Sequence, residues 1–162
     1  MTISQAEFKA IMASAAGPVT VVTAMGSDGG PRGLTMSAVC SVSLDPPLIL
    51  ACVDRGSATL AAIRESRSFT VNYLRRGSEA VALEFATKSL DKFVGRDWER
   101  SATGLGGPIL ADRNAAHAVC AVTDLIDAGD HVIAVGEVRE GGVREEHAVL
   151  AYARRTFFAA SA

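Results

Sequence analysis

The order of strand-like and helix-like segments limits the fold of this chain more than any other feature of its sequence. Short runs rich in β-branched and aromatic residues recur between clusters of turn-forming residues, and only about three segments have the spacing of helices. The runs do not alternate regularly with helices, which argues against a doubly wound parallel sheet. We therefore predict a mainly β fold with flanking helices, most simply a small closed β-barrel.

The individual segments can be assigned by residue number. Behind Ser4, the residues Phe8, Ile11 and Met12 have the spacing of a short amphipathic helix. Further helices are expected at residues 57–65 and 79–87. The expected strands are residues 18–24, 34–43, 48–53, 69–74, 117–126, 131–138 and 148–153, with 48–53 apolar enough to be a buried strand.

Length and charge restrict the classes of protein to which the chain can belong. At 162 residues, with nothing that looks like a linker, residues 1–162 are most simply one domain. The formal net charge is -2, so the chain lacks the excess of positive charge that is typical of proteins that bind nucleic acid or an anionic membrane. Both partners are therefore disfavoured. No apolar run approaches the roughly 18 to 20 residues that span a bilayer, and the first residues lack the order of a secretory signal, so we expect a cytoplasmic protein.

The cysteines and histidines do not predict a metal site. Cys40, Cys52 and Cys120 are odd in number and widely spaced, so we interpret all three as small core residues rather than disulfide or zinc partners. The histidines at 117, 131 and 147 lack the close spacing of known ligand pairs. We expect no metal.

Residues 54–60, DRGSATL, have the outline of an anion-binding helix start. A buried strand is followed by Asp54, Arg55 and a glycine, and Ser57 then opens a helix whose first N–H groups point outward. The hydroxyls of Ser57 and Thr59 can donate to phosphate oxygens, and Arg55 can add charge. The plain alternative is that Ser57 only caps the helix.

Two other segments carry weaker signals. The stretch 33–47 places Thr35, Ser37, Ser41 and Ser43 in alternation, so hydroxyls could line one face of a sheet, although such residues are usually the solvated face of a strand. The glycine cluster at 26–33 lacks the spacing of a dinucleotide or Walker loop and favours a hairpin loop. In DAGDHV, residues 127–132, Gly129 and Asp130 are turn formers, and the turn would bring His131 to the rim of the barrel.

Taken together, several of these segments resemble the flavin reductase-like family. The pieces are GPVTVVTA, GLTMSAVCSVSLDPPLILACVDRGSATL, FTVNYL, DKFVG, GPIL, AGDHVIAVGEV and LAYARRTF, spread over about residues 17–158. The resemblance implies an FMN-binding split barrel that forms a homodimer and reduces FMN or FAD with NADH or NADPH. It also implies that the reduced flavin serves a separate flavin-dependent monooxygenase.

The resemblance also implies roles for individual residues. Thr35, Met36, Ser37 and Ala38 match the segment beside the isoalloxazine ring, and Ser41 matches a position near it. The segment that binds the ribityl phosphate in the family is matched by Asp54, Arg55, Ser57 and Thr59. A loop close to the flavin is matched by Lys92 and Phe93, and there the lysine would add positive charge beside the phosphate. His131 matches a histidine beside the nicotinamide site, the one residue to which a catalytic role is assigned, and Tyr152, Arg154 and Phe157 match a C-terminal segment that closes over it. Val39, Cys40 and Phe157 depart from residues common in the family.

Two other functions stay open from the sequence. The first is a flavin carrier or sensor without turnover, and the second is an oxidoreductase that acts on an organic substrate through a permanently bound flavin. The sequence does not decide between FAD and FMN, or between NADH and NADPH. For His131 we prefer positioning of the nicotinamide over acid catalysis, because hydride transfer does not itself need a protein proton donor.

Overall fold

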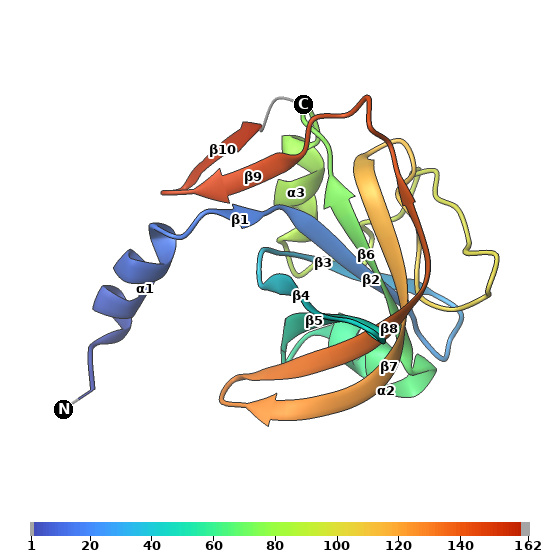
Figure 1. The fold of residues 1–162 in the computed structure, drawn as a ribbon, viewed down its shortest axis with the longest axis horizontal. Helices are drawn as coiled ribbons and strands as arrows, with labels where there is room; N and C mark the ends of the chain where they lie inside the picture. Colours follow the sequence, from blue (N-terminus) through green and yellow to red (C-terminus); the bar gives the residue numbers. More distant parts are fainter. Residues whose placement is uncertain (1, 160–162) are drawn as a thin grey trace.

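The chain forms a seven-stranded antiparallel sheet that curls back on itself, as seen in a computed structural model that describes residues 2–159 (Figure 1). The strand order is β3-β2-β6-β7-β8-β5-β4, so β3 and β4 form opposite edges although only Ser37 and Ala38 separate them in the chain. Three Cα steps cover at most about 11 Å, whereas seven strands laid flat span roughly 29 Å. The sheet must therefore curve until its edges approach. The mainly β fold is confirmed; β3 and β4 are not neighbours in the hydrogen-bonded order, so closure of the barrel stays a prediction.

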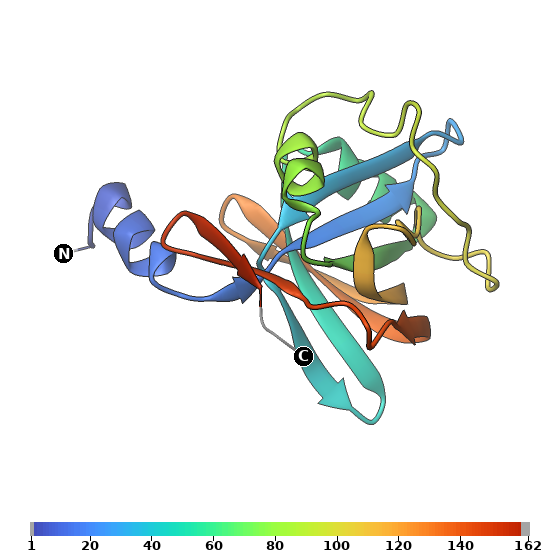
Figure 2. The ribbon, with the colours of Figure 1, turned by 90° about the horizontal axis from the view of Figure 1, so that it is seen from above.

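The large sheet is accompanied by a small sheet of order β1-β9-β10 and by three helices. In Figure 2 the β4–β5 hairpin, drawn in cyan, reaches away from the rest of the large sheet. The strands of the large sheet are β2 (Thr20–Met25), β3 (Pro31–Met36), β4 (Val39–Leu44), β5 (Pro47–Asp54), β6 (Ser68–Leu74), β7 (Asn114–Ala128) and β8 (His131–Val143). The others are β1 (Gly17–Pro18), β9 (Leu150–Ala153) and β10 (Thr156–Ala159), and the helices are α1 (Gln5–Ala13), α2 (Ala58–Ser66) and α3 (Glu79–Phe85).

The segment 34–43, expected as one strand, is two strands on opposite edges of the large sheet. It breaks at Ser37 and Ala38, where the Val39 N–H donates to the Ser37 carbonyl over 2.9 Å. Nothing local forbids a continuous strand there, and the curvature of the sheet causes the break. The short strands β1 and β10 were not expected either, because two or four residues carry too little periodicity to be recognised.

The two helices expected at 57–65 and 79–87 are present as α2 and α3, and both bury side chains against the sheet. α2 buries Thr59, Leu60, Ala62 and Ile63 and packs on β2 and β3, while α3 packs its buried Phe85 near β3. Around Phe85 lies a second apolar core that includes Leu110 and Leu150. The two helices therefore fix the position of β3, which forms one wall of the cavity described below.

One face of β5 and β8 is left uncovered, and we call it the outer sheet face. Ala51 and Val53 are buried, whereas Leu50 and Cys52, which alternate with them along β5, are only partly covered. The same alternation continues on β8, where Ile133 and Val135 lie half exposed. The expectation of a buried strand at 48–53 therefore holds on one face only, because within the described residues no helix covers the other side.

The cysteines follow the same division between covered and uncovered surfaces. Cys120 is buried as expected, and burial raises its pKa to about 12. Cys40 is exposed and Cys52 half exposed on the open side of the sheet, so the prediction that these two are core residues is wrong. All three are free thiols.

The predicted N-terminal helix is present, but it buries nothing. The Ser4 side chain accepts from the Glu7 N–H over 3.2 Å, and the Glu7 carboxylate accepts from the Ser4 N–H over 2.8 Å, which is a capping box. Phe8, Ile11 and Met12 are each at least half exposed, and Figure 1 shows α1 standing away from the body of the molecule. Among residues 2–159, no helix combines the length and the apolar character needed to cross a membrane.

Candidate functional site

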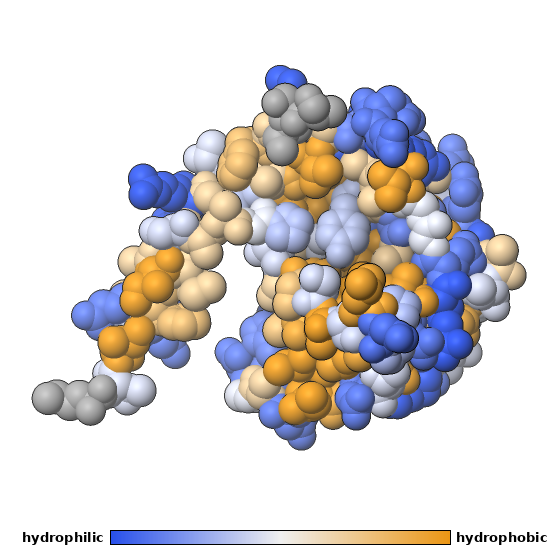
Figure 3. Space-filling model, viewed as in Figure 1, coloured by the Kyte–Doolittle hydropathy of each residue, from blue (hydrophilic) through white to orange (hydrophobic). Residues whose placement is uncertain are grey.

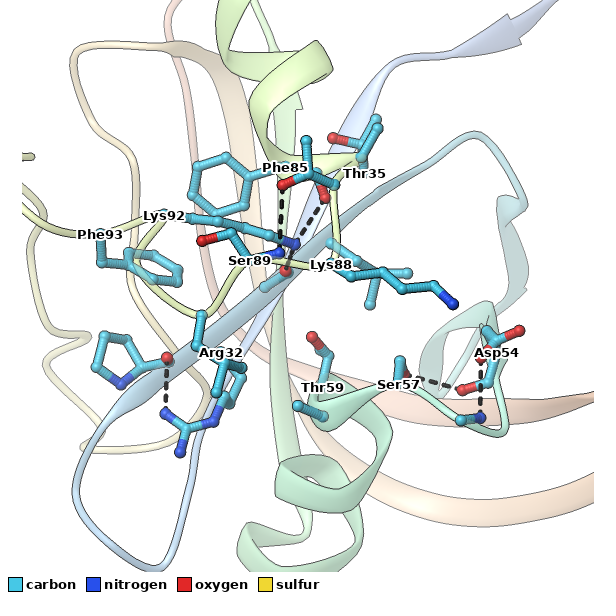
Figure 4. Close-up of a pocket in the computed structure, with 18 residues that line it drawn as sticks. Arg32, Thr35, Asp54, Ser57, Thr59, Phe85, Lys88, Ser89, Lys92 and Phe93 are labelled. Carbon is cyan, nitrogen blue, oxygen red and sulfur yellow. Dashed lines mark hydrogen bonds between the residues drawn. The ribbon is translucent and has the colours of Figure 1, made fainter.

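A cavity of about 540 Å³ lies between β3, the start of α2 and the loop that follows α3 (Figure 4). A volume of this size is typical of small-molecule sites. It brings together six of the residues expected at the flavin: Thr35, Asp54, Ser57, Thr59, Lys92 and Phe93. The lining also includes residues that were not predicted, namely Arg32, Phe85, Thr87, Lys88, Ser89 and Leu90.

The start of α2 forms one wall of this cavity. Gly56 N–H donates to the Asp54 carboxylate over 2.8 Å, which turns the chain from β5 into the helix. Ser57 is the N-cap: its hydroxyl donates to the Asp54 carbonyl over 2.9 Å and accepts from the Leu60 N–H over 3.1 Å. The interpretation of Ser57 as a cap is confirmed, and its hydroxyl is already engaged in both roles. An anion at this end would therefore meet the first backbone N–H groups of the helix, which lack intrahelical acceptors.

Thr59 is the hydroxyl on α2 that faces the cavity. The residue is only 3% exposed, and Figure 4 shows its side chain pointing into the space below Lys88. Among the described residues its hydroxyl has no hydrogen-bond partner within the protein. A hydroxyl without a partner at a cavity wall is suited to donate to a ligand oxygen.

Lys92 is held within the wall by the backbone. Its Nζ donates to the carbonyls of Gly33 and Phe85, over 3.0 Å each, and lies 5.8 Å from the centroid of the Phe85 ring. Only 7% of the residue is exposed, and burial lowers the pKa of its ammonium. Lys92 thus ties β3 to the end of α3, and at most one of its N–H groups is left for the phosphate contact predicted for it. Phe93 packs against Phe85 with ring centroids 5.0 Å apart and forms an apolar part of the wall, as expected.

Two further positively charged side chains line the cavity, and the sequence did not predict either of them as a site residue. Lys88 has no ion-pair partner among the described residues, and in Figure 4 it extends toward the side on which Asp54 and Ser57 lie. Arg32 is held by the Asp28 carboxylate at 2.6 Å and by the Pro31 carbonyl at 3.1 Å. Neither residue belongs to a recognisable motif, so only the fold reveals that they face α2 across the same space.

Arg55 lies outside the cavity. Its Nε donates to the Gly129 carbonyl over 2.8 Å, and its guanidinium pairs with Asp127 at 3.0 Å. The backbone N–H of Arg55 also donates to the Asp130 carbonyl. The arginine therefore ties the β5–α2 junction to the β7–β8 turn, and it would have to leave these partners to reach a phosphate.

The residues expected beside the isoalloxazine ring follow the cavity along the end of β3 and the start of β4. The Thr35 hydroxyl donates to the Ala82 carbonyl of α3 over 2.7 Å, so it helps to hold α3 on the sheet. Met36 is partly buried, whereas Ser37, Ala38 and Ser41 are exposed and do not line the cavity. Thr35 is thus the one member of this group at the cavity, and the others continue away from it.

His131 opens β8 directly after the predicted turn. Gly129 has a φ of 63°, which glycine adopts without strain, so the turn is formed as expected. The register places His131 opposite Asp54 of β5, one strand from the cavity lining. Its Nδ1 lies 2.7 Å from Asp130 Oδ1, and this contact lowers the pKa of the Asp130 carboxylate.

The structure does not bring the expected C-terminal residues to the cavity. Tyr152 of β9 and Phe157 of β10 are opposite one another, with ring centroids 5.0 Å apart. Arg154 lies in the turn between them with a φ of 47°, and its N–H donates to the carbonyl of Ala13, the last residue of α1. Figure 1 places this hairpin beside β1, at the other end of the molecule from α2.

No group of three or more His, Cys, Asp or Glu side chains among residues 2–159 is arranged to hold a metal ion. His117 is partly buried on β7, and its Nδ1 has no hydrogen-bond partner there. It lies apart from the cavity and takes no part in it.

Comparison with known proteins identifies the family. Residues 12–161 match the model of the flavin reductase like domain. The NADH flavin reductase of Kitasatospora aureofaciens is 45% identical over 151 residues, covering 93% of this chain and 78% of that protein, and the NADPH flavin reductase of Lentzea aerocolonigenes is 40% identical, covering 96% and 89%. A solved structure is also similar, that of the NADH:FAD oxidoreductase SgcE6 of Streptomyces globisporus C-1027 in complex with NAD and FAD fragments. It superimposes on this chain with a TM-score of 0.89 at 32% identity, and the match covers 98% of this chain and 93% of that one. The chain therefore belongs to the flavin reductase-like domain family.

Proposed function

We propose that this protein is an NAD(P)H-dependent flavin reductase that takes its flavin phosphate at the start of α2. The observation that supports this most is the cavity in which the N–H groups of α2, the free Thr59 hydroxyl and the unpaired Lys88 converge. Each is a donor or a positive charge suited to a phosphate, and only Asp54 opposes them. Its carboxylate already accepts a hydrogen bond from the Gly56 N–H.

The flavin and the nicotinamide supply the redox chemistry: hydride leaves the reduced nicotinamide and reduces the isoalloxazine ring. The task of the chain is to hold the two rings in contact. With the phosphate at α2, the ring would lie along Met36, Ser37 and Ala38, where exposed backbone groups can bind its polar edge, with Ser41 close by. Lys92 would act mainly by shaping the wall through β3 and α3.

We assign His131 to the nicotinamide side. It lies next to Asp54 in the sheet but outside the cavity, so it is placed to orient a second ligand beside the flavin rather than to bind the phosphate. Its contact with Asp130 favours one orientation of the ring. Tyr152, Arg154 and Phe157 would complete the nicotinamide site only if their hairpin approached it from a second copy of the chain.

A homodimer is part of this proposal. The outer sheet face is apolar, Ile126 beside it is 51% exposed and Leu44 of β4 is 92% exposed. The α1 helix adds the exposed Phe8 and Ile11, and Figure 3 shows apolar side chains gathered on both surfaces. Contiguous apolar surface of this kind favours association. Sedimentation velocity should give a dimer, and a monomer at micromolar concentration would contradict this part of the proposal.

The reduced flavin would be passed to a separate monooxygenase. Relatives of this chain are named as reductase components of such systems, including the reductase subunit HsaB of a flavin-dependent monooxygenase from Rhodococcus jostii, 35% identical over 151 residues. A cytoplasmic location follows from the use of NAD(P)H and suits the three free thiols.

Steady-state oxidation of NADH or NADPH with added riboflavin, FMN or FAD tests the activity. Oxidation that rises and saturates with free flavin supports the reductase. Tight retention of flavin without faster nicotinamide oxidation would instead identify a carrier or sensor. One turnover per bound flavin, followed by dependence on an organic substrate, would identify an enzyme with a permanent flavin.

A further inference from the structure

We infer that the part of the cavity beyond Thr59, toward Arg32, holds the adenosine monophosphate half of FAD, so that this chain favours FAD over FMN. The inference rests on the proposed function, because it takes the ribityl phosphate to lie at the start of α2. It goes further by assigning an occupant to the remaining volume and a residue that distinguishes the two flavins.

The first argument is the volume left over. Of the residues expected beside the ring, only Thr35 lines the cavity, whereas Met36, Ser37 and Ala38 lie outside it, so most of the isoalloxazine ring would lie beyond the cavity. A phosphate group is only a few times larger than a water molecule, which occupies about 30 Å³. It therefore takes up only a small part of the cavity of about 540 Å³. An FMN bound at α2 would thus leave most of the cavity to solvent.

The second argument is the chemistry of the far wall. Arg32 lines it from β3, and its guanidinium is already fixed by Asp28 at 2.6 Å and by the Pro31 carbonyl. A guanidinium held in one orientation can stack on a purine and offer charge to a phosphate without losing further side-chain freedom.

Two other lining residues supply the apolar surface that a base needs. Leu90 lines the cavity and is 62% exposed, so its side chain is open to contact with a ligand. Phe93 forms the adjoining surface. Figure 4 shows Arg32 on the far side of Thr59 from Ser57 and Asp54, so the two ends of the cavity can hold the two halves of a dinucleotide.

The test measures equilibrium dissociation constants for riboflavin, FMN and FAD by calorimetry, without nicotinamide. Wild-type protein should bind FAD more tightly than FMN. Arg32→Gln should weaken FAD binding by about tenfold, the loss of one charge-assisted contact, and leave FMN and riboflavin within about twofold. Leu90→Glu, at an exposed loop position, should have the same selectivity because it brings a negative charge to the adenylate end.

Asp28→Asn is the matched control. It removes the ion pair that holds Arg32 but keeps the guanidinium, so FAD affinity should change much less than in Arg32→Gln. Equal binding of FAD and FMN by the wild type would overturn the inference. So would equal losses for both flavins in Arg32→Gln and Leu90→Glu, no loss in either variant, or the full Arg32→Gln effect in Asp28→Asn. None of these results tests the proposed reductase activity. That proposal is refuted only if the rate of nicotinamide oxidation does not depend on any added flavin.

Discussion

Thr59 and Ser57 lie two residues apart at the start of α2, and the structure gives their hydroxyls different tasks. Ser57 donates to the Asp54 carbonyl and accepts from the Leu60 N–H, whereas Thr59 has no partner among the described residues and faces the cavity. Thr59→Val keeps the shape of the side chain and removes only the hydroxyl. Ser57→Ala removes the cap and leaves the cavity wall intact. The two variants should therefore separate flavin binding from stability.

The expected magnitudes follow from these contacts. A hydrogen bond from Thr59 to a charged phosphate is worth about 1.5 to 3 kcal/mol, so Thr59→Val should raise the dissociation constants of FMN and FAD roughly 10- to 150-fold. Its free energy of unfolding should change by less than about 0.5 kcal/mol, because no hydrogen bond within the protein is lost. Ser57→Ala should lower the free energy of unfolding by about 1 kcal/mol, or about 2 to 4 °C in Tm for a chain of this size.

Titration calorimetry with riboflavin, FMN and FAD, combined with thermal unfolding, checks both variants. Riboflavin lacks the phosphate, so its affinity should be the same in Thr59→Val and in the wild type. FMN affinity in Ser57→Ala should stay within about twofold of the wild type, since the cap hydroxyl is already engaged. Normal FMN binding by Thr59→Val, or an equal loss of riboflavin, would refute the assignment of the phosphate to this helix start.

Further variants test other parts of the structure. His131→Ala should raise the KM for NADH about fivefold or more while changing flavin affinity less, in steady-state assays, and equal losses for both ligands would contradict the assignment. Burial lowers the pKa of His117 from 6.5, so the unfolded chain binds a proton at this histidine more readily than the folded chain does. The free energy of unfolding should therefore fall as pH drops through about 6.5. In urea titrations, His117→Gln should reduce this dependence of the free energy of unfolding on pH. A Cβ at Gly107 would lie 2.3 Å from the Ala24 backbone nitrogen, so Gly107→Ala should cost about 3 kcal/mol or more or prevent folding, and a change below about 1 kcal/mol would contradict the packing. Arg67 caps the C-terminal end of α2 with a φ of 54°, a left-handed conformation that glycine adopts with less strain than arginine. Arg67→Gly should therefore raise the free energy of unfolding by about 0.5 kcal/mol, and a lower free energy of unfolding would contradict this reasoning.

The elements that the sequence predicted well have strong local signals. Leu60 and Ile63 have helical spacing and are buried in α2, and the Gly129 turn is present because glycine tolerates the backbone angle required. The expected cap at Ser57 is present as well. In each case the deciding interaction joins residues only a few positions apart.

The features that were missed depend on contacts between distant segments. The break after Met36 arises because β3 and β4 lie at opposite edges of one curved sheet. Cys52 is half exposed because nothing among the described residues covers that face. Lys88 and Arg32 carry no motif, yet the fold brings both to one cavity, while Arg55, which did match a motif, turns to the hairpin instead.

Hydride transfer from nicotinamide to a freely exchanging flavin can be measured directly. Under anaerobic conditions, catalytic amounts of the protein should reduce a large excess of FAD, seen as loss of flavin absorbance, with one NADH or NADPH oxidised for each flavin reduced. Reduction that stops after one flavin per protein chain, or nicotinamide oxidation that proceeds equally without flavin, would contradict the reductase.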